Sequence, residues 1–215
     1  MTDADRTEAF DTLFMLPAGT SAAELARDCR EAALEFVNQS ERWGHGELAT
    51  WLTGPYATLV RYTSKREAGR RVWPRSILRN VDPRLIDRIM RTAREEVRDT
   101  LARIARDGSA SFVIQALISG TVMRCEDGAG EPTWAPTGAA TRLADRVLSL
   151  FAVDYLARPV DYETRLSLCE ACRHVSFDET ARLRGLCSRH ASVGRLWAGA
   201  GGGRRLTLPY PPIGA

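Results

Sequence analysis

The amino-acid sequence predicts an α+β fold, with a mainly helical domain that contains a β-hairpin and a small cysteine-rich module at the C-terminal end. Three observations support this prediction. Long stretches repeat apolar residues every three or four positions, which is the period of a helix. One stretch is rich in β-branched residues and is bounded by turn residues. Three of the five cysteines fall between residues 168 and 190.

The composition is that of an ordinary globular chain, with 215 residues, 44% hydrophobic and 27% charged. No apolar run approaches the roughly 20 residues that a membrane-spanning helix needs. The N-terminal stretch MTDADRTEAFDTLF is acidic and polar, unlike a secretory signal. We therefore expect a cytoplasmic protein without membrane insertion. An odd number of cysteines also argues against a disulfide framework, and we expect Cys29 and Cys125 to be small buried side chains.

The net charge of +3 is too small to indicate a nucleic-acid-binding protein, but the charge is unevenly distributed. Residues 165–215 contain eight arginines and three acidic residues, whereas residues 1–164 carry 22 basic and 24 acidic residues. Arginine abundance by itself is expected of a GC-rich genome. The asymmetry indicates a basic C-terminal region.

The first predicted helix spans residues 20–40. Ser21 and Glu24 have the spacing of a capping box, in which each side chain satisfies a backbone N–H of the first turn. Apolar residues then recur at helical spacing up to Trp43-Gly44, which ends the pattern. Residues 45–69 also favour helix, although Gly54-Pro55 should break or kink it, so that two short helices or one bent helix fit equally. We expect the aromatic residues of this stretch to lie in the core.

The clearest predicted helix spans residues 82–108. Asp82 suits the N-cap, Pro83 suits the first helical position, and Gly108 closes the helix. Its polar side carries acidic and basic residues at i,i+4 spacing, among them Asp99 with Arg103. The apolar stripe consists of Ile86, Met90, Ala93, Val97, Leu101 and Ile104.

A hairpin is predicted next. Residues 111–126 are rich in β-branched residues and indicate a buried strand, although a short apolar run can also be helical. The turn DGAGEP leads to a short return strand, which Pro132 and Pro136 confine to an edge. A last amphipathic helix over residues 139–158 stops before Pro159 and is expected to pack against the sheet.

The C-terminal cysteines and a histidine form the pattern Cys169-x2-Cys172-x14-Cys187-x2-His190. Two ligands separated by two residues can point inward from one tight turn, and a second such pair completes a tetrahedral shell of the kind that structural zinc prefers. Cys187 and His190 are expected near the first turn of a helix, where the helix dipole favours a thiolate. The sequence therefore predicts a structural Zn²⁺ site.

This segment, about residues 166–197, resembles the treble-clef and zinc-ribbon class of small zinc modules. In that class one turn and the start of a helix each supply two ligands. The segment departs from many ribbons because Arg173 and His174 follow the first pair, where a glycine is common. Residues 1–164 resemble no family that we recognise. The predicted organisation is thus a core domain of residues 1–164, a zinc-binding module of residues 165–197 and a flexible Gly/Pro-rich tail of residues 198–215.

Alternatives to zinc remain. Cys169 and Cys172 can form a redox dithiol, but no strand–helix setting for one is visible and it leaves the second pair unexplained. An iron–sulfur cluster more often uses four cysteines. Chance clustering is the third alternative. Within a zinc site, His174 is an alternative to His190 as the fourth ligand.

The functional expectation is a non-enzymatic intracellular adaptor or regulator whose zinc module and tail bind another protein. A closed shell of four protein ligands leaves no position for substrate. The first alternative is a transcription-related protein that binds nucleic acid through the basic module, with Arg173, Arg182, Arg184, Arg189 and Arg195 on phosphates. The second is an enzyme with an unrecognised site. The glycines of residues 199–203 lack the Lys-Ser/Thr of a phosphate loop, and the LPYPP stretch of the tail suits either groove docking or an unstructured end.

Overall fold

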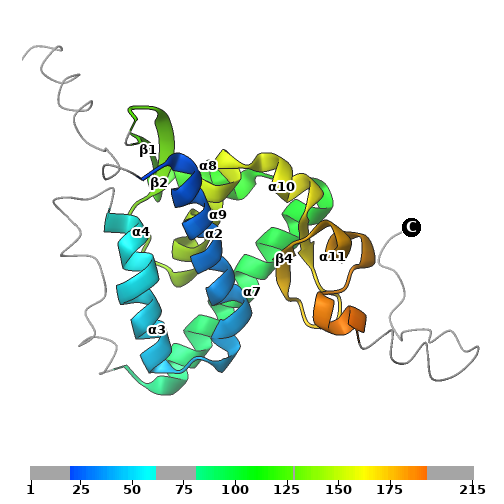
Figure 1. The fold of residues 1–215 in the computed structure, drawn as a ribbon. Coiled ribbons are helices and arrows are strands. Elements are labelled where there is room, and N and C mark those ends of the chain that lie inside the picture. The colour runs from blue at the N-terminus through cyan, green and yellow to red at the C-terminus, as the bar shows by residue number, and fades with distance from the viewer. Residues whose placement is uncertain (1–19, 62–80, 128, 193–215) are drawn as a thin grey trace, which may run out of the picture.

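The computed structural model describes residues 20–61, 81–127 and 129–192. These residues form a mainly helical fold with two small antiparallel hairpins, which confirms the predicted α+β class (Figure 1). The helical elements are α2 (Ala22–Gln39), the 3₁₀-helix η1 (Ser40–Arg42), α3 (His45–Trp51), the π-helix η2 (Leu52–Tyr56), α4 (Ala57–Arg61), α7 (Pro83–Asp107), α8 (Ser111–Ile118), α9 (Leu143–Ala157), α10 (Pro159–Thr164) and α11 (Glu179–Arg184). The strands are β1 (Val122–Glu126), β2 (Pro132–Pro136), β3 (Leu166–Leu168) and β4 (Val175–Phe177).

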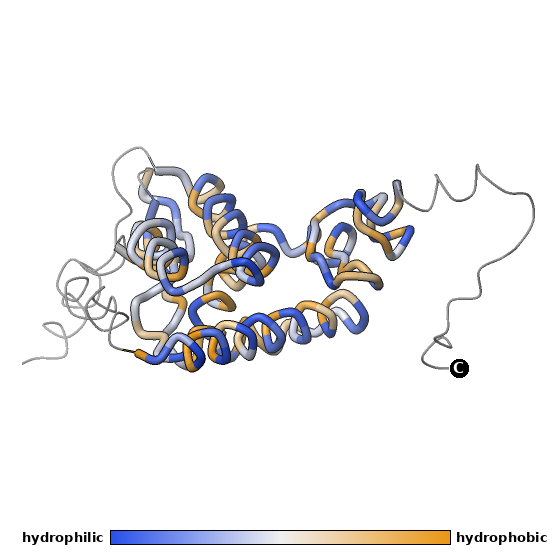
Figure 2. Tube along the Cα trace, turned by 90° about the horizontal axis from the view of Figure 1, so that it is seen from below, coloured by the Kyte–Doolittle hydropathy of each residue, from blue (hydrophilic) through white to orange (hydrophobic). Residues whose placement is uncertain are grey.

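Helix α7 confirms the clearest prediction. The Asp82 side chain caps it by accepting a hydrogen bond of 2.9 Å from the Arg84 N–H, Pro83 is its first residue, and Gly108 ends it at φ 65°. All six residues of the predicted stripe are buried. In Figure 2 this long helix extends along one side of the molecule towards the Cys/His segment. It therefore connects the helical core to that segment.

Helices α2 and α9 pack against each other. Helix α2 begins with the predicted capping box, in which the Glu24 N–H donates to Ser21 Oγ and the Ser21 N–H donates to the Glu24 carboxylate. Helix α9 stops before Pro159 as predicted, and it packs against α2, α7 and α8 as well as against β2. The short helix α10, which begins at Pro159, was not predicted.

The helix around Gly54-Pro55 is neither broken into two nor simply bent. Helices α3 and α4 are joined by the π-helical turn η2, which contains Pro55 and so accommodates a residue that lacks a backbone N–H. Trp51 and Tyr56 are buried with their rings stacked at 5.5 Å, which confirms a core role for these aromatics. The part of this prediction beyond residue 61 lies outside the described residues.

The predicted strand over residues 111–126 is wrong in its first half. Residues 111–118 form α8, and only residues 122–126 form β1. The burial pattern explains the error, because Phe112, Val113 and Ala116 are buried on one helical face while Ile118 is 83% exposed. A left-handed Gly120 (φ 67°) ends the helix and turns the chain into the strand.

Strand β1 pairs antiparallel with β2, as the predicted hairpin requires. Its register places Arg124 opposite Trp134 and Cys125 opposite Thr133. Pro132 and Pro136 occupy the two ends of β2 in a two-stranded sheet, which is the edge position that proline tolerates.

One continuous hydrophobic core joins the helices to the second hairpin, since Leu166 of β3 and Val175 of β4 belong to the same buried cluster as α2, α7 and α9. A cation–π contact of Arg30 also reaches from the helices to the second hairpin. Arg30 of α2 donates to Asp154 of α9 at 2.6 Å, and its guanidinium lies 4.0 Å from the centre of the Phe177 ring of β4. The predicted division between residues 164 and 165 stays a prediction, and both apolar contacts and a cation–π contact join the two sides.

No helix in the described part of the chain is both long and apolar enough to cross a membrane. The predicted tail of residues 198–215, with its glycine run and LPYPP stretch, lies outside the described residues.

Candidate metal centre

The structure brings the four predicted ligands together. The ligand atoms of Cys169, Cys172, Cys187 and His190 all lie within 4.8 Å of one another. His190 Nδ1 lies 3.3 Å from the Cys187 sulfur and 3.5 Å from the Cys169 sulfur, and the sulfurs of Cys172 and Cys187 are 3.9 Å apart. Sulfur and nitrogen ligands in a tetrahedral zinc shell lie roughly 3.5–3.8 Å apart. These residues can therefore hold one metal ion after small side-chain movements.

The first pair of ligands sits in the tight turn between β3 and β4. The strands pair antiparallel from Leu166↔Phe177 to Leu168↔Val175. The turn is then closed by the Arg173 N–H, which donates to the Cys169 carbonyl at 2.7 Å, and by the Cys169 N–H, which donates to the His174 carbonyl at 2.9 Å. This short hairpin points the sulfurs of residues 169 and 172 to the same side.

The second pair lies at the start of a helix, as predicted. Residues 188–192 are helical, and the Ala191 N–H donates to the Cys187 carbonyl at 2.9 Å. Helix α11 leads into this turn and ends at Gly185 with φ 65°. The Gly185 carbonyl accepts a hydrogen bond from the Glu170 N–H at 2.9 Å, which holds the two ligand pairs side by side. Glycine suits this left-handed position, and the Glu170 carboxylate that a Cβ would approach to 2.8 Å is the end of an exposed, flexible side chain.

The turn also controls the charge on the sulfurs. Burial acts to raise the pKa of Cys169, but hydrogen bonds from the backbone N–H groups of Cys187, Cys172 and Ala171 lower that pKa to about 6. Burial, together with the nearby thiols of Cys169 and Cys187, raises the pKa of Cys172 to about 11. Ionised Cys169 thus disfavours ionisation of Cys172. A bound divalent cation would stabilise all three sulfurs as thiolates.

Contacts from the helical core hold the site in place. Both atoms of the Asn38 amide bind the backbone of Val175, with Nδ2 donating to its carbonyl and Oδ1 accepting from its N–H, each at 2.9 Å. Arg182 of α11 donates to the carbonyls of Leu166 at 2.7 Å and of Ala105 at 3.2 Å. The site is therefore fixed to α2 and α7 as well as to its own turn.

The other candidates do not join the site. His174 lies outside the four-residue cluster, and partial burial lowers the pKa of its imidazole. Cys29 and Cys125 are buried, as expected. Burial raises the pKa of the Cys29 thiol well above its usual range, with a further contribution from the Asp154 carboxylate. None of these three residues belongs to the cluster of four ligand atoms.

Comparisons of the chain with protein-family models, with curated proteins and with solved structures found no match. The resemblance to treble-clef and zinc-ribbon modules therefore stays a prediction that rests on the ligand pattern.

Sequence reasoning missed the residues that support the site. Asn38 appeared only as part of a helix, and Arg182 appeared as a phosphate-binding candidate. At helical spacing Asn38 shares a face with Arg27, Glu31 and Leu34, so no local pattern marks it as a contact residue. Nothing local to Arg182 indicates that its partners are the carbonyls of residues 105 and 166.

Proposed function

We propose that Cys169, Cys172, Cys187 and His190 bind one structural zinc ion. Three thiolates and one imidazole form a donor set that zinc favours, and four protein ligands leave no open coordination position for chemistry. The segment has little core of its own, because Ala181 is the only buried residue of α11 and Leu183 is 82% exposed. Zinc binding on the order of 10 kcal/mol would stabilise such a segment.

Elemental analysis of the purified full chain tests this proposal. We expect about one zinc per chain, a loss of zinc in His190→Gln, and full zinc content in the matched variant His174→Gln. A preparation without metal, in which the thiols of residues 169, 172 and 187 all titrate freely, would overturn the proposal.

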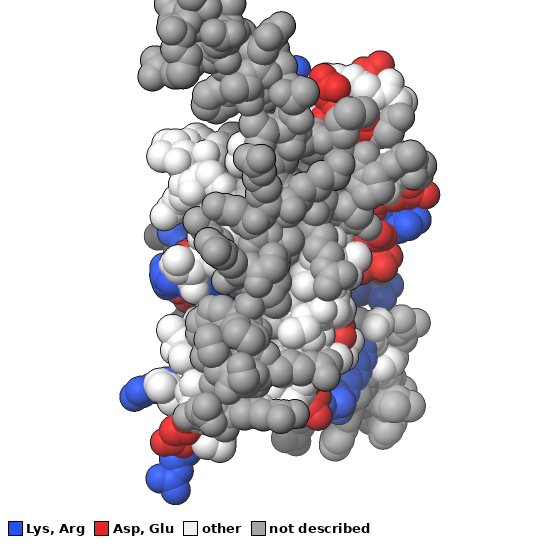
Figure 3. Space-filling view, turned by 90° about the vertical axis from the view of Figure 1, so that its left-hand side faces the viewer, with Lys and Arg blue, Asp and Glu red and all other residues white. Residues whose placement is uncertain are grey.

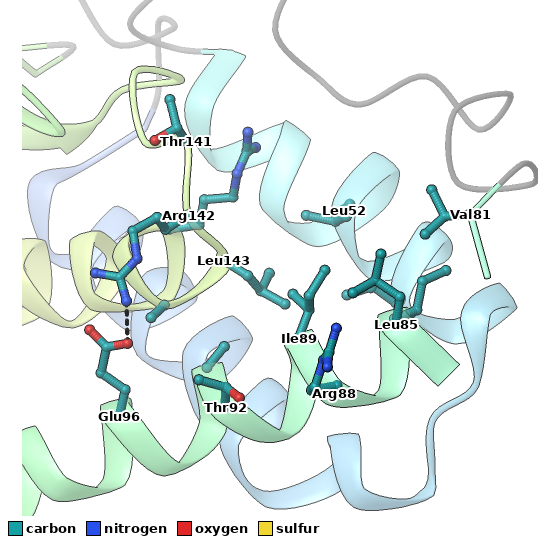
Figure 4. Close-up of a pocket in the computed structure, with 15 residues that line it drawn as sticks. Leu52, Val81, Leu85, Arg88, Ile89, Thr92, Glu96, Thr141, Arg142 and Leu143 are labelled. Carbon is teal, nitrogen blue, oxygen red and sulfur yellow. Dashed lines mark hydrogen bonds and ion pairs between the residues drawn. The ribbon is translucent and has the colours of Figure 1, made fainter. Parts of the chain in front are cut away.

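We further propose that the protein is a non-enzymatic adaptor or regulator that binds another protein through a groove in its helical part. The groove has a volume of about 520 Å³ and lies between α7, the α3–η2 segment and the start of α9. Figure 4 shows Leu52, Leu85, Ile89 and Leu143 converging on it. Apolar side chains form most of its wall, and such a groove typically receives the apolar face of an amphipathic helix.

The charges around the groove indicate the kind of helix. At one end Arg142 is paired with Glu96, as the dashed line in Figure 4 shows. Arg88, on the α7 side, lines the groove and has no ion-pair partner among the described residues. We therefore propose that the partner helix carries an acidic residue opposite Arg88.

The nucleic-acid alternative receives less support. Arg173 is paired with Asp99, and Arg182 is bound to two backbone carbonyls, so two of the five arginines assigned to phosphates already have internal partners. Arg195 lies outside the described residues. Figure 3 shows the side of the molecule that faces away from the Cys/His segment, where basic and acidic side chains of the described residues are interspersed towards the edges.

A polar cavity of about 420 Å³ beside α8 and α9 is a candidate for the enzyme alternative. Its two carboxylates, Glu96 and Asp145, are both paired with Arg142. Ion pairing explains their presence, so this cavity favours a structural role over acid–base catalysis.

A capture experiment with groove variants tests the adaptor proposal. The zinc-loaded chain is used as bait in an extract from its native cell, with and without nuclease, beside Leu85→Glu in the groove and Ile118→Glu on exposed α8. We expect a protein that is retained after nuclease treatment, lost with Leu85→Glu and kept with Ile118→Glu. Equal retention by all three baits, or retention of nucleic acid at physiological salt instead, would contradict the proposal.

A further inference from the structure

A second cavity lies directly beside the metal centre, with a volume of about 380 Å³. Two parts of the chain form its walls. The end of α2 and the 3₁₀-helix η1 supply Gln39, Arg42 and Trp43, and the Cys/His segment supplies Cys172, His174 and Arg189. Its size falls within the range of small-molecule sites.

Two basic side chains line the cavity, next to two cysteines of the metal centre. Its lining includes two arginines and no carboxylate. Arg42 and Arg189 are both exposed, and neither forms an ion pair with another described residue. This distinguishes them from Arg173 and Arg182, whose guanidinium groups have partners inside the protein. Two unpaired guanidinium groups at one cavity favour a ligand with a doubly charged group such as phosphate.

The α2 side of the cavity includes an aromatic side chain, Trp43. The Trp43 ring packs against Phe36 and Trp51, with ring centres at 5.8 and 6.3 Å, and this packing fixes its orientation. The ring is only partly buried and lines the cavity. Gln39 is exposed beside it, whereas the neighbouring Asn38 amide is already occupied by Val175. A fixed indole with an accessible amide nearby suits a planar heterocyclic ring.

We propose that this cavity binds a mononucleotide, with the phosphate between Arg42 and Arg189 and the base against Trp43. The inference goes beyond the proposed adaptor function and rests on the metal centre only for the cavity wall, since Cys172 and Cys187 belong to both. The metal holds the Arg189 wall against the Arg42 wall, so removal of the metal separates the two halves of the phosphate site.

Isothermal titration of the zinc-loaded full chain with adenosine monophosphate, inorganic phosphate and a phosphoserine peptide tests the proposal. We expect one adenosine monophosphate per chain, bound more tightly than either of the other two probes. Arg42→Gln and Arg189→Gln should each weaken binding about tenfold or more, because each removes a charge-assisted hydrogen bond. The matched variant Arg184→Gln, an exposed arginine on α11 that does not line the cavity, should bind like the wild type.

Three results would overturn the proposal. They are no saturable binding of the nucleotide at millimolar concentration, tighter binding of the phosphopeptide, and equal binding by the Arg42→Gln, Arg189→Gln and Arg184→Gln variants. Zinc content is measured on the same samples. If zinc is retained and the nucleotide does not bind, the cavity assignment fails while the metal proposal stands. If both arginine variants lose zinc and the wild type binds no nucleotide, the two arginines only balance the charge of the thiolate cluster.

Discussion

Arg173 donates a hydrogen bond of 2.5 Å to Asp99 Oδ1, and this contact joins the metal-ligand turn to the middle of helix α7. Arg173 is also the only described non-glycine residue with a positive φ, 56°. The backbone there adopts the conformation that glycine provides in many zinc ribbons, and the arginine side chain adds a contact that glycine lacks. Asp99 thus pairs with Arg173 and not, as predicted, with Arg103.

Substitution at Arg173 should separate the effect of its left-handed backbone conformation from the effect of its ion pair with Asp99. A left-handed conformation costs a non-glycine residue roughly 1–2 kcal/mol, while an exposed ion pair contributes roughly 0.2–1 kcal/mol. We therefore expect Arg173→Gly to unfold at the same temperature as the wild type or higher, and Arg173→Val to unfold at a lower one. Thermal denaturation of the zinc-loaded proteins measures this, with Asp99→Asn as the control for the pair alone. A glycine variant less stable than the valine variant would show that backbone conformation is not the limiting factor.

Asn38 should contribute more to stability than its partly exposed position indicates. Replacement by Ala leaves the Val175 N–H and carbonyl of β4 without partners, which costs about 1–3 kcal/mol. The neighbouring change Gln39→Ala should cost less than about 0.5 kcal/mol, because it removes an exposed side chain. Chemical denaturation of the two variants provides the comparison, and equal stabilities would contradict the role assigned to Asn38.

Metal removal should loosen the chain locally. After chelation we expect faster amide hydrogen exchange in residues 169–192, where α11 buries only Ala181. Exchange in α7 should stay slow, since its apolar stripe packs in the main core whether or not metal is bound. Unchanged protection of residues 169–192 after verified zinc loss would show that the turn is stable without a metal.

Thiol reactivity should divide the five cysteines into two groups. Burial, aided by Asp127 and Glu126, raises the pKa of Cys125 to about 11, and burial raises that of Cys29 further above the usual range. Both thiols stay protonated at pH 8, so alkylation followed by peptide mass spectrometry should leave them unmodified. Once the metal has been removed, Cys169 should react first among the ligand cysteines, because its pKa of about 6 leaves the sulfur ionised at pH 8. Modification of Cys29 in the folded chain at pH 8 would contradict its burial.

The same shifts predict a pH effect on stability. A thiol whose pKa is raised in the folded state is protonated when folded and ionises more easily when unfolded. The stability that Cys29 and Cys125 contribute is therefore complete below about pH 9 and decreases as the pH rises above it. Denaturation midpoints measured between pH 7 and 10 should fall at the alkaline end, and less steeply in Cys125→Ala.

The sequence by itself determined the features that depend on neighbouring residues. The Asp82 and Gly108 boundaries of α7, the capping box at Ser21 and the ligand pattern that ends at His190 all follow from short-range spacing. Capping and helical periodicity are local interactions, and two x2-spaced ligand pairs come together once each lies in a turn.

Only the tertiary structure decided the features that depend on what packs nearby. Residues 111–118 are apolar enough for either strand or helix, and packing against α9 selects helix α8. The partners of Arg173, Arg182 and Asn38 lie 74, 77 and 137 positions away in sequence at their farthest. No local pattern encodes such pairs, because a polar side chain bonds to whichever unsatisfied group the fold brings within reach.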